Sequence, residues 1–329
     1  MSRIRPSSVL ALAVAVAGWV AAPLLAAPGR LSPERLSWRE ISFQGSKFGI
    51  SLRADLKLEP ISAAGVEQEL LPSRRGAGIA PAEAGALALA LGSEVLDRRS
   101  DIRLLVDPDS GAALQRVQTD SGRKRRIKSL RYGELGISTV RTRPAAGEVD
   151  LPSERWTDVR EGGDDYPPLP EGGLRVSDPT ALFYVVAASD VARPGDSVGV
   201  PIFSDDRLLL VEAKVLELRR VEVDYELGDG TAWRRVRGPT TALRLSLEAH
   251  VVGGDGDGGT GDASFELAGL RGDVEMLLDP VSRIPLELSG RVPYAGRVAI
   301  RLGRAVERSE PAAANAAQRP AARSETSRR

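Results

Sequence analysis

Apolar and polar residues alternate along most of the chain, a pattern typical of β-strands with one buried face. In residues 50–58, apolar side chains occupy every second position, and Ser, Arg, Asp and Lys stand between them. Similar runs separated by turn residues occur at 41–44, 102–106, 113–119, 127–132, 136–141, 198–203, 208–218, 221–227, 243–252, 274–278, 284–289 and 295–302. The pattern predicts a mainly β protein built from antiparallel hairpins.

One stretch departs from this alternation, and we expect it to form a helix at about residues 178–189. Asp178 suits the N-cap, and Pro179 suits the first helical position. Leu182, Val185 and Val186 fall at helical spacing, and two aromatic residues widen the apolar face. The expected fold is a curved antiparallel sheet or open β-barrel with this one central helix packed on it.

Two regions interrupt the expected strands. Residues 61–96 resemble an insertion, and their segment 81–91 fits either a short helix or a strand of small residues. Residues 144–170 form a long polar, proline-rich connection between two β blocks, at about 36–143 and 171–303. This connection is either a domain boundary or a loop across the sheet, and a single β-rich domain over residues 28–306 is our prediction.

The first 27 residues have the pattern of a signal peptide. Arg3 and Arg5 precede an apolar run, and small residues end it at Ala27, where we expect cleavage. An uncleaved membrane anchor is the alternative, because the apolar run approaches a spanning length. We predict a periplasmic protein with no stable membrane span after cleavage. The chain has no cysteine, which excludes a lipidated N-terminal cysteine and disulfides. Residues 307–329 lack apolar periodicity and are expected to be disordered.

Charge is balanced, with 45 basic and 45 acidic residues. A neutral chain has no overall field that attracts nucleic acid, so we expect no such partner. The basic run at residues 123–126, with Lys128, is interpreted as a solvated strand end. Its alternative role is contact with acidic polysaccharide or lipid headgroups.

Few residues have the type or spacing expected of a catalytic or metal-binding site, and we predict no catalytic residue, no metal and no cofactor. His250 is the only histidine. A hydrolase that uses His250 with Asp255 or Asp257 is the least favoured hypothesis, because we recognise no assembled set of catalytic groups around it. The Gly- and Asp-rich residues 253–262 do not have the spacing of an EF-hand and are interpreted as a hairpin tip.

Four segments resemble a known family. The helix D-P-T-A-L-F-Y-V with R-P-G-D-S at 193–197, and segments 43–56, 106–126 and 276–298, are similar to motifs of the domain of unknown function 3108 family. Residues 61–96 and 253–262 depart from its pattern. The resemblance implies a curved antiparallel sheet or open barrel in a secreted or envelope protein of Gram-negative bacteria. It carries over no catalytic residue.

The leading functional hypothesis is a non-enzymatic binding or envelope-assembly protein of the periplasm. A curved sheet closed by a helix can enclose a groove for a lipid-like or glycan ligand. Phe183, Tyr184, Val186, Ile50 and Leu52 would line that groove, although burial in the core is the ordinary role of such aromatic residues. The alternative is a scaffold that contacts another protein through a strand edge or its Arg-rich tail, and the sequence identifies no specific protein partner.

Overall fold

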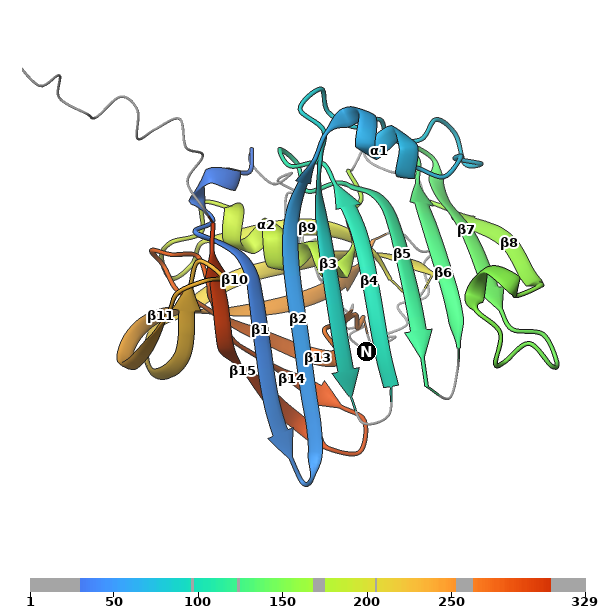
Figure 1. Ribbon diagram of the computed structural model, residues 1–329. Coiled ribbons are helices and arrows are strands. Elements are labelled where there is room, and N and C mark those ends of the chain that lie inside the picture. Colours follow the sequence, from blue (N-terminus) through green and yellow to red (C-terminus); the bar gives the residue numbers. More distant parts are fainter. Residues whose placement is uncertain are drawn as a thin grey trace, which may run out of the picture.

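The computed structural model describes residues 30–95, 98–122, 125–167, 175–204, 206–252 and 263–308. They form one large sheet and a few short helices (Figure 1). The strands are β1 (Trp38–Lys47), β2 (Ile50–Ile61), β3 (Ala86–Val95), β4 (Arg98–Val106), β5 (Ala113–Ser121), β6 (Arg126–Tyr132), β7 (Gly136–Arg143), β8 (Asp158–Asp165), β9 (Ser197–Ser204), β10 (Arg207–Gly228), β11 (Trp233–Val251), β12 (Glu266–Leu267), β13 (Leu270–Leu278), β14 (Pro285–Val292) and β15 (Gly296–Glu307). The α-helices are α1 (Ala63–Glu69) and α2 (Leu182–Ala188), and the 3-10 helices are η1 (Pro33–Arg35), η2 (Ser153–Arg155) and η3 (Pro179–Ala181).

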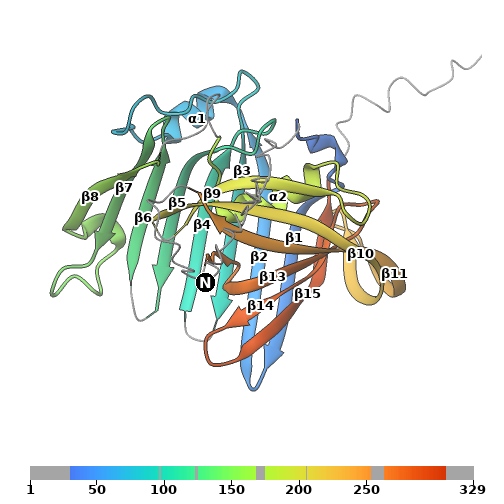
Figure 2. The same ribbon diagram turned by 180° about the vertical axis from the view of Figure 1, so that it is seen from behind.

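The two β blocks form one continuous sheet, because the first strand pairs with the last. The strand order is β8-β7-β6-β5-β4-β3-β2-β1-β15-β14-β13-β11-β10-β9, and β12 pairs with β13 beside this path. Neighbours along the path are antiparallel. The sheet curves so that β9 and β10 pass behind β3 to β6, with α2 between the two layers (Figures 1 and 2). The predicted mainly β antiparallel fold with one central helix is confirmed.

Helix α2 lies in the centre of the core, and every one of its seven residues is buried. The rings of Phe43, on β1, and Phe183, on α2, have their centroids 6.1 Å apart. A helix this short is unstable in isolation, where at least about 12 residues are needed. Its stability therefore depends on packing and on groups that satisfy its ends.

Side chains satisfy both ends of this helical segment, a local one at its start and one distant in sequence at its other end. At the start, the carboxylate of Asp178 accepts from the backbone N–H of Thr180 at 2.9 Å, which confirms the predicted N-cap. At the other end, the buried guanidinium of Arg283 donates to the carbonyl oxygens of Val186, Ala187, Ser189 and Val191 at 2.8–3.0 Å. These bonds satisfy carbonyl groups that have no partner within the helix.

Residues 61–96 are an integral part of the sheet, so their interpretation as an insertion was wrong. They contain α1 and β3, and β3 pairs with both β2 and β4. Leu89 and Leu91 face the core beside α2, whereas Ala88 packs under α1 with Val66. Because α1 covers part of the other face of β3, small apolar residues occupy both faces, and the simple alternation of a half-exposed strand is lost.

Three other strands extend beyond the sequence pattern. The polar connection at 144–170 contains the edge strand β8, and the segments 208–218 and 221–227 belong to one strand of 22 residues, β10. Strand β11 has 19 residues and pairs with β10 along its whole length. The end of this long hairpin returns to the body, where Leu227 of β10 pairs in parallel with Ala305 of β15. Residues 219–220 and 233–241 of this hairpin include no buried side chain, so no apolar periodicity marks these parts.

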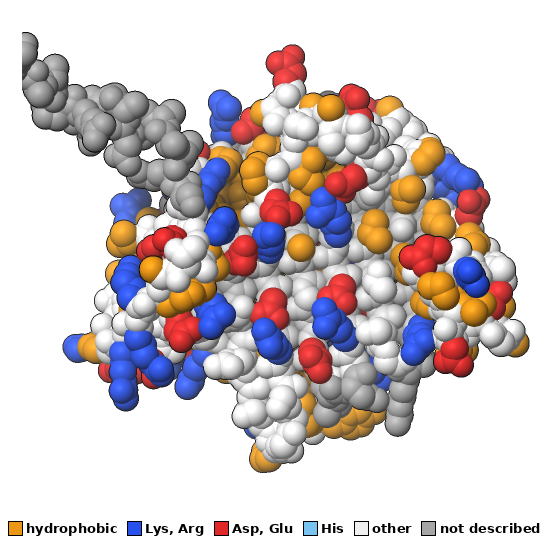
Figure 3. Space-filling view, in the orientation of Figure 1, with side chains coloured by type: hydrophobic (Ala, Val, Ile, Leu, Met, Phe, Trp, Pro, Cys, Tyr) orange, Lys and Arg blue, Asp and Glu red, His pale blue; other side chains and the backbone are white. Residues whose placement is uncertain are grey.

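The outer face of β1 to β8 carries mixed charges (Figure 3). Arg53 pairs with Asp55 at 2.8 Å, and Arg99 pairs with Asp101 at 2.9 Å. Such exposed pairs contribute little to stability and keep the face hydrophilic. No helix in the described residues is long and apolar enough to cross a membrane. The predicted leader and the tail beyond residue 308 lie outside the described residues.

Candidate functional site

The residues predicted to line a ligand groove lie in the hydrophobic core. Phe183, Tyr184 and Val186 have 0 % exposed surface, and Leu52 is also buried. Ile50 is partly buried and packs against the same core. The hydroxyl of Tyr184 donates to the carbonyl oxygen of Pro108. A ligand would reach these helix side chains only if the core opened, so their role in this structure is packing.

His250 lies exposed on β11, opposite Leu210 of β10, and its side chain makes no hydrogen bond or ion pair with any described residue. Asp255 and Asp257 lie outside the described residues, as does the whole of loop 253–262. Among the described residues, no group of three or more His, Cys, Asp or Glu side chains could hold a metal ion. The structure therefore does not describe Asp255 and Asp257, the hypothetical partners of His250.

Residues 195–199 have the G-x-S-x-G spacing of a hydrolase nucleophile elbow, a match that the sequence expectations above overlooked. An elbow places the serine between a strand and a helix. Here Ser197 follows a turn and begins β9, where it pairs with Lys214. Lys214 pairs in turn with Ser246, four residues before His250 on β11. Ser197 and His250 are thus offset by about 13 Å along the strands, and they do not form a catalytic pair.

Two surface cavities also lack the features of a binding site. The larger, about 360 Å³, lies beyond the end of α2 and is lined by both acidic and basic residues, including Asp190 and Arg193. The smaller, about 250 Å³, lies at the tip of the β10–β11 hairpin. There the guanidinium of Arg304 already lies 4.5 Å from the ring centroid of Trp233. Neither cavity combines an open aromatic face with an excess of one charge.

A different group of residues, the inner polar cluster, lies on β4 to β7 and at the tip of the β9–β10 hairpin. It comprises Ser100, Arg116, Gln118, Asp120, Arg126, Lys128, Arg141 and Asp206. The cross-strand register places these residues in adjacent positions, since Gln118 is opposite Lys128 and Lys128 is opposite Arg141. The face that they share also carries Leu130 and Tyr132, which belong to the core. Polar residues thus continue the inner face where the apolar core ends.

Hydrogen bonds connect this cluster to the start of the central helix. Arg116 donates to the Asp178 carboxylate at 3.0 Å and to the side-chain oxygen of Gln118 at 2.8 Å. Gln118 donates to Asp120 at 2.8 Å, and Arg126 donates to Asp120 at 2.5 Å. The hydroxyl of Tyr132 also donates to Asp178, at 2.9 Å. The chain of contacts holds the side chains of β5 and β6 in fixed positions.

Exposure increases along this chain of contacts. The side chain of Asp178 is fully buried, that of Arg116 is 16 % exposed, and that of Arg126 is 38 % exposed. Asp206, at the hairpin tip, is 54 % exposed. The cluster therefore extends from the protein interior to a solvent-accessible rim, where a ligand can reach it without any opening of the core.

Positive charge exceeds negative charge at this rim. Lys128 has a side chain only 21 % exposed, and the carboxylate oxygen nearest to its Nζ atom among the described residues, on Asp206, is 4.0 Å away. Arg141 contacts the same oxygen at 3.7 Å. Burial lowers the pKa of Lys128, nearby Arg141 lowers it further, and Asp206 raises it by less. Asp206 is thus the shared counter-ion of Lys128 and Arg141, and both distances are close to the upper limit of an ion pair.

The buried end of the cluster also has an unused donor. The Nε–H of Arg116 is buried and has no hydrogen-bond partner among the described residues. An unpaired buried donor is unfavourable because it has left water without gaining a bond. The four cations of the cluster, Arg116, Arg126, Lys128 and Arg141, face three carboxylates, those of Asp120, Asp178 and Asp206. Among the described residues, the cluster thus has one more positive charge than negative charge.

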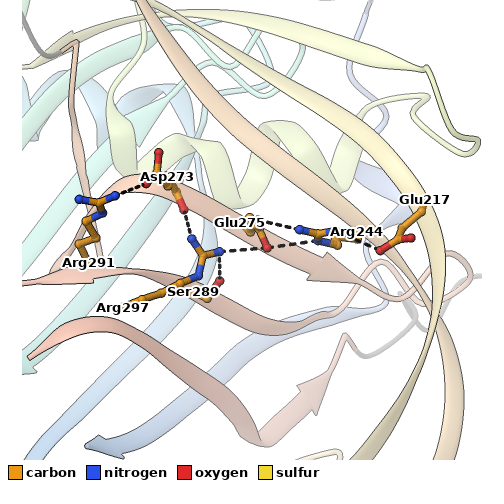
Figure 4. A network of polar contacts seen from close by, with 7 residues as sticks. All are labelled: Glu217, Arg244, Asp273, Glu275, Ser289, Arg291 and Arg297. Atoms are coloured by element: carbon orange, nitrogen blue, oxygen red, sulfur yellow. Dashed lines mark hydrogen bonds and ion pairs between the residues drawn. The ribbon is translucent and has the colours of Figure 1, made fainter.

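A second charged network contains equal numbers of basic and acidic side chains. On β10, β11 and β13 to β15, Arg244 contacts Glu217 at 3.1 Å and Glu275 at 2.9 Å, and Arg297 contacts Glu275 at 3.0 Å (Figure 4). Arg291 pairs with Asp273 at 2.8 Å. Here three arginines face three carboxylates at direct contact distance. This network supports cross-strand pairing and has no excess charge for a ligand.

The basic run of the sequence is therefore not a simple solvated strand end. Arg126 and Lys128 face inward as members of the inner polar cluster. Arg125 donates to the carbonyl oxygen of Val149, and residues 123–124 lie outside the described residues. The alternation of Arg126, Lys128, Leu130 and Tyr132 on one strand face was visible in the sequence. Their inward orientation was not, because charged residues ordinarily occupy the solvent face.

Comparison with known proteins returns no matching family model, no matching curated protein and no matching solved structure. The resemblance to the domain of unknown function 3108 family therefore stays a prediction.

Proposed function

We propose that this protein is a non-enzymatic binding protein of the bacterial envelope, exported to the periplasm by its leader. Its proposed site is the inner polar cluster, and its proposed ligand is an anionic group of an envelope polysaccharide or lipid. The signal-peptide pattern supports the location. The excess of positive charge on a partly buried rim supports the class of ligand.

The position of Lys128 is the observation that carries this proposal. Its ammonium group lies near three arginines, and within the described part of the chain its nearest carboxylate oxygen is 4.0 Å away. Keeping such a group partly desolvated is unfavourable unless an anion compensates it. A carboxylate or phosphate group beside Lys128 and Arg141 would supply that compensation, with Lys128 as a point charge and Arg141 as a planar donor.

Asp206 supports the same location for the anion. Its carboxylate lies at the β9–β10 tip, between Lys128 and Arg141, at distances longer than a hydrogen bond. A ligand anion could take over these contacts while Asp206 turns to solvent, since its side chain is already half exposed. The hairpin tip thus marks the entrance of the proposed site.

The test compares the protein with its Lys128→Met variant in calorimetric titrations with oligogalacturonate, a soluble acidic polysaccharide, and with inorganic phosphate. Lys214→Met is the matched control, because Lys214 lies exposed on β10 and forms no ion pair with any described residue. We expect Lys128→Met to weaken binding of at least one probe by about tenfold, which is 1.4 kcal/mol. Equal affinities for the protein and both variants, or no binding at all, would refute the proposed site.

The scaffold alternative has one supporting observation, the strand β8 at the end of the sheet. Its outer edge pairs with no described strand. However, β8 carries Asp158, Arg160, Glu161, Asp164 and Asp165. Charged side chains on an edge strand oppose pairing with another chain. The inner polar cluster is therefore the better-supported site.

A further inference from the structure

Two aromatic side chains project into solvent from the tips of hairpins at one end of the molecule. Phe48, between β1 and β2, is 83 % exposed, and Tyr294, between β14 and β15, is 100 % exposed. Both tips lie at the lower end in Figure 1 and again in Figure 2. Strands β1 and β15 are paired neighbours, so the two tips belong to adjacent hairpins. The molecule thus places two exposed aromatic residues at the same end.

Both residues have backbone conformations that disfavour an aromatic side chain. Phe48 has φ 52° and is followed by Gly49 with φ 78°, in a two-residue loop between the paired residues Lys47 and Ile50. Positive φ at both central positions is the mark of a type I′ turn, which favours Asn-Gly. A bulky residue in the left-handed region is a strained exception.

Tyr294 shows the same conflict in another kind of turn. It has φ 68° and follows Pro293, and the N–H of Ala295 donates to the carbonyl oxygen of Val292 at 3.2 Å. This is the pattern of a type II turn, which favours Gly or Asn after the proline. Phe48 buries little of its surface within the fold and Tyr294 buries none, so packing offsets little of this strain. Contact with a partner outside the protein would explain why aromatic residues occupy these two strained positions.

Basic side chains lie beside the two tips. The ammonium group of Lys47 lies 5.2 Å from the ring centroid of Phe48 and donates to the carbonyl oxygen of Arg297 at 2.6 Å, so it connects the two hairpins. The start of β4 lies at the same end of the sheet, because β4 pairs antiparallel with β3 and β3 with β2, and Arg98 there is exposed. Exposed aromatic residues next to Lys and Arg match the boundary between lipid headgroups and acyl chains.

We propose that this end of the molecule is a membrane-docking tip, defined by Lys47, Phe48 and Tyr294, and that it binds the surface of an anionic lipid bilayer. Phe48 and Tyr294 enter the headgroup region, and Lys47 lies among the lipid phosphates. Each nearby cation adds attraction to an anionic surface. This inference goes beyond the proposed ligand site and does not require Lys128.

The test is co-sedimentation with vesicles, using the protein as purified from the producing cell, with its N-terminus established by intact mass. Vesicles of phosphatidylcholine alone are compared with vesicles that also contain phosphatidylglycerol. The double variant Phe48→Asn, Tyr294→Asn removes both rings and keeps residues suited to the left-handed region, so it retains the fold. The matched control is Val281→Asn, which removes an 88 % exposed apolar residue from the β13–β14 turn at the opposite end of the sheet.

We expect the protein and the Val281→Asn variant to bind the anionic vesicles and the double variant to bind about tenfold more weakly, equivalent to 1.4 kcal/mol. Lys128→Met is expected to bind them like the protein, which separates this inference from the proposed ligand site. Equal binding by the double variant would overturn the inference, as would no vesicle binding by the protein. A dimer that only the double variant dissociates, measured by sedimentation velocity without lipid, would assign the tips to a second copy of the chain and likewise overturn it.

Discussion

Arg116 and Asp178 form an ion pair that joins the sheet to the central helix. The Nη1 atom of Arg116, on β5, lies 3.0 Å from Oδ2 of Asp178, and the carboxylate is fully buried. The same carboxylate caps the helical segment through Thr180 and accepts a hydrogen bond from Tyr132. One side chain therefore fixes the start of the helix, the inner face of β6 and the first member of the inner polar cluster.

Replacing Asp178 with alanine should destabilise the fold strongly. The substitution leaves the Arg116 charge buried without its partner, which typically costs about 3–5 kcal/mol, and it also removes the N-cap. Asp178→Asn should cost less, because its amide oxygen can still accept from the Thr180 N–H. Urea unfolding of both variants measures the difference, and Asp224→Ala, which breaks an exposed pair with Arg235, should leave the midpoint unchanged. Similar midpoints for Asp178→Ala and the protein would contradict this account.

Arg283 should be as important for the other end of the helical segment. Its guanidinium donates to four carbonyl groups, and burial lowers its pKa. We expect Arg283→Met to lower the free energy of unfolding by about 3 kcal/mol, because buried carbonyls lose their charged donor. Arg291→Met, on the exposed network of Figure 4, should change it by no more than about 0.5 kcal/mol. Equal effects in the two variants, measured by urea unfolding, would show that the Arg283 contacts do not stabilise the helix.

Substituting Phe48 with asparagine should stabilise the fold while it impairs the proposed membrane-docking tip. The left-handed conformation costs most residues about 1–2 kcal/mol, and Asn is a preferred residue at this turn position. We expect a gain of about 1 kcal/mol in urea unfolding. The Phe48→Leu variant keeps both the strain and the exposed apolar group, so it should show no gain. A loss of stability in Phe48→Asn would mean that the ring contributes to folding after all.

Lys128 should make stability depend on pH in a specific direction. Its pKa in the folded protein is below the ordinary value of 10.5. Between the lowered pKa and 10.5 the unfolded chain binds more protons than the folded protein, so this group makes stability rise with pH in that window. Its unfavourable contribution is complete at lower pH, where Lys128 is charged in both states.

The comparison of Lys128→Met with the protein isolates this effect. We expect the variant to be more stable at neutral pH and its advantage to shrink as the pH approaches 10.5. Chemical denaturation at a series of pH values provides the measurement, and the difference between the two proteins cancels groups that titrate alike in both, such as the buried tyrosines. An advantage that grows with pH, or a variant that is less stable at neutral pH, would contradict the assigned cause.

The sequence by itself determined the local elements of this protein. The strict alternation in residues 50–58 marks a strand because side chains of a strand point to opposite faces in turn, and β2 confirms it. Asp178 and Pro179 mark the start of the helical segment because their chemistry suits its first positions. The Asp-Pro turns at residues 107 and 279 join β4 to β5 and β13 to β14, because Asp, Pro and Gly adopt turn conformations at low cost. These features depend on neighbours within a few residues.

Only the tertiary structure decided how these elements combine. The pairing of β1 with β15 joins residues far apart in the chain, and no local pattern encodes it. Strand β3 was misjudged because apolar side chains occupy both of its faces under α1, and β8 was missed because an edge strand need not bury either face. Arg126 and Lys128 look like surface residues until the curvature of the sheet brings the β9–β10 hairpin over them. Burial is a property of the assembled fold, and for that reason the inner polar cluster emerged only from the structure, which also decided between core and groove for Phe183.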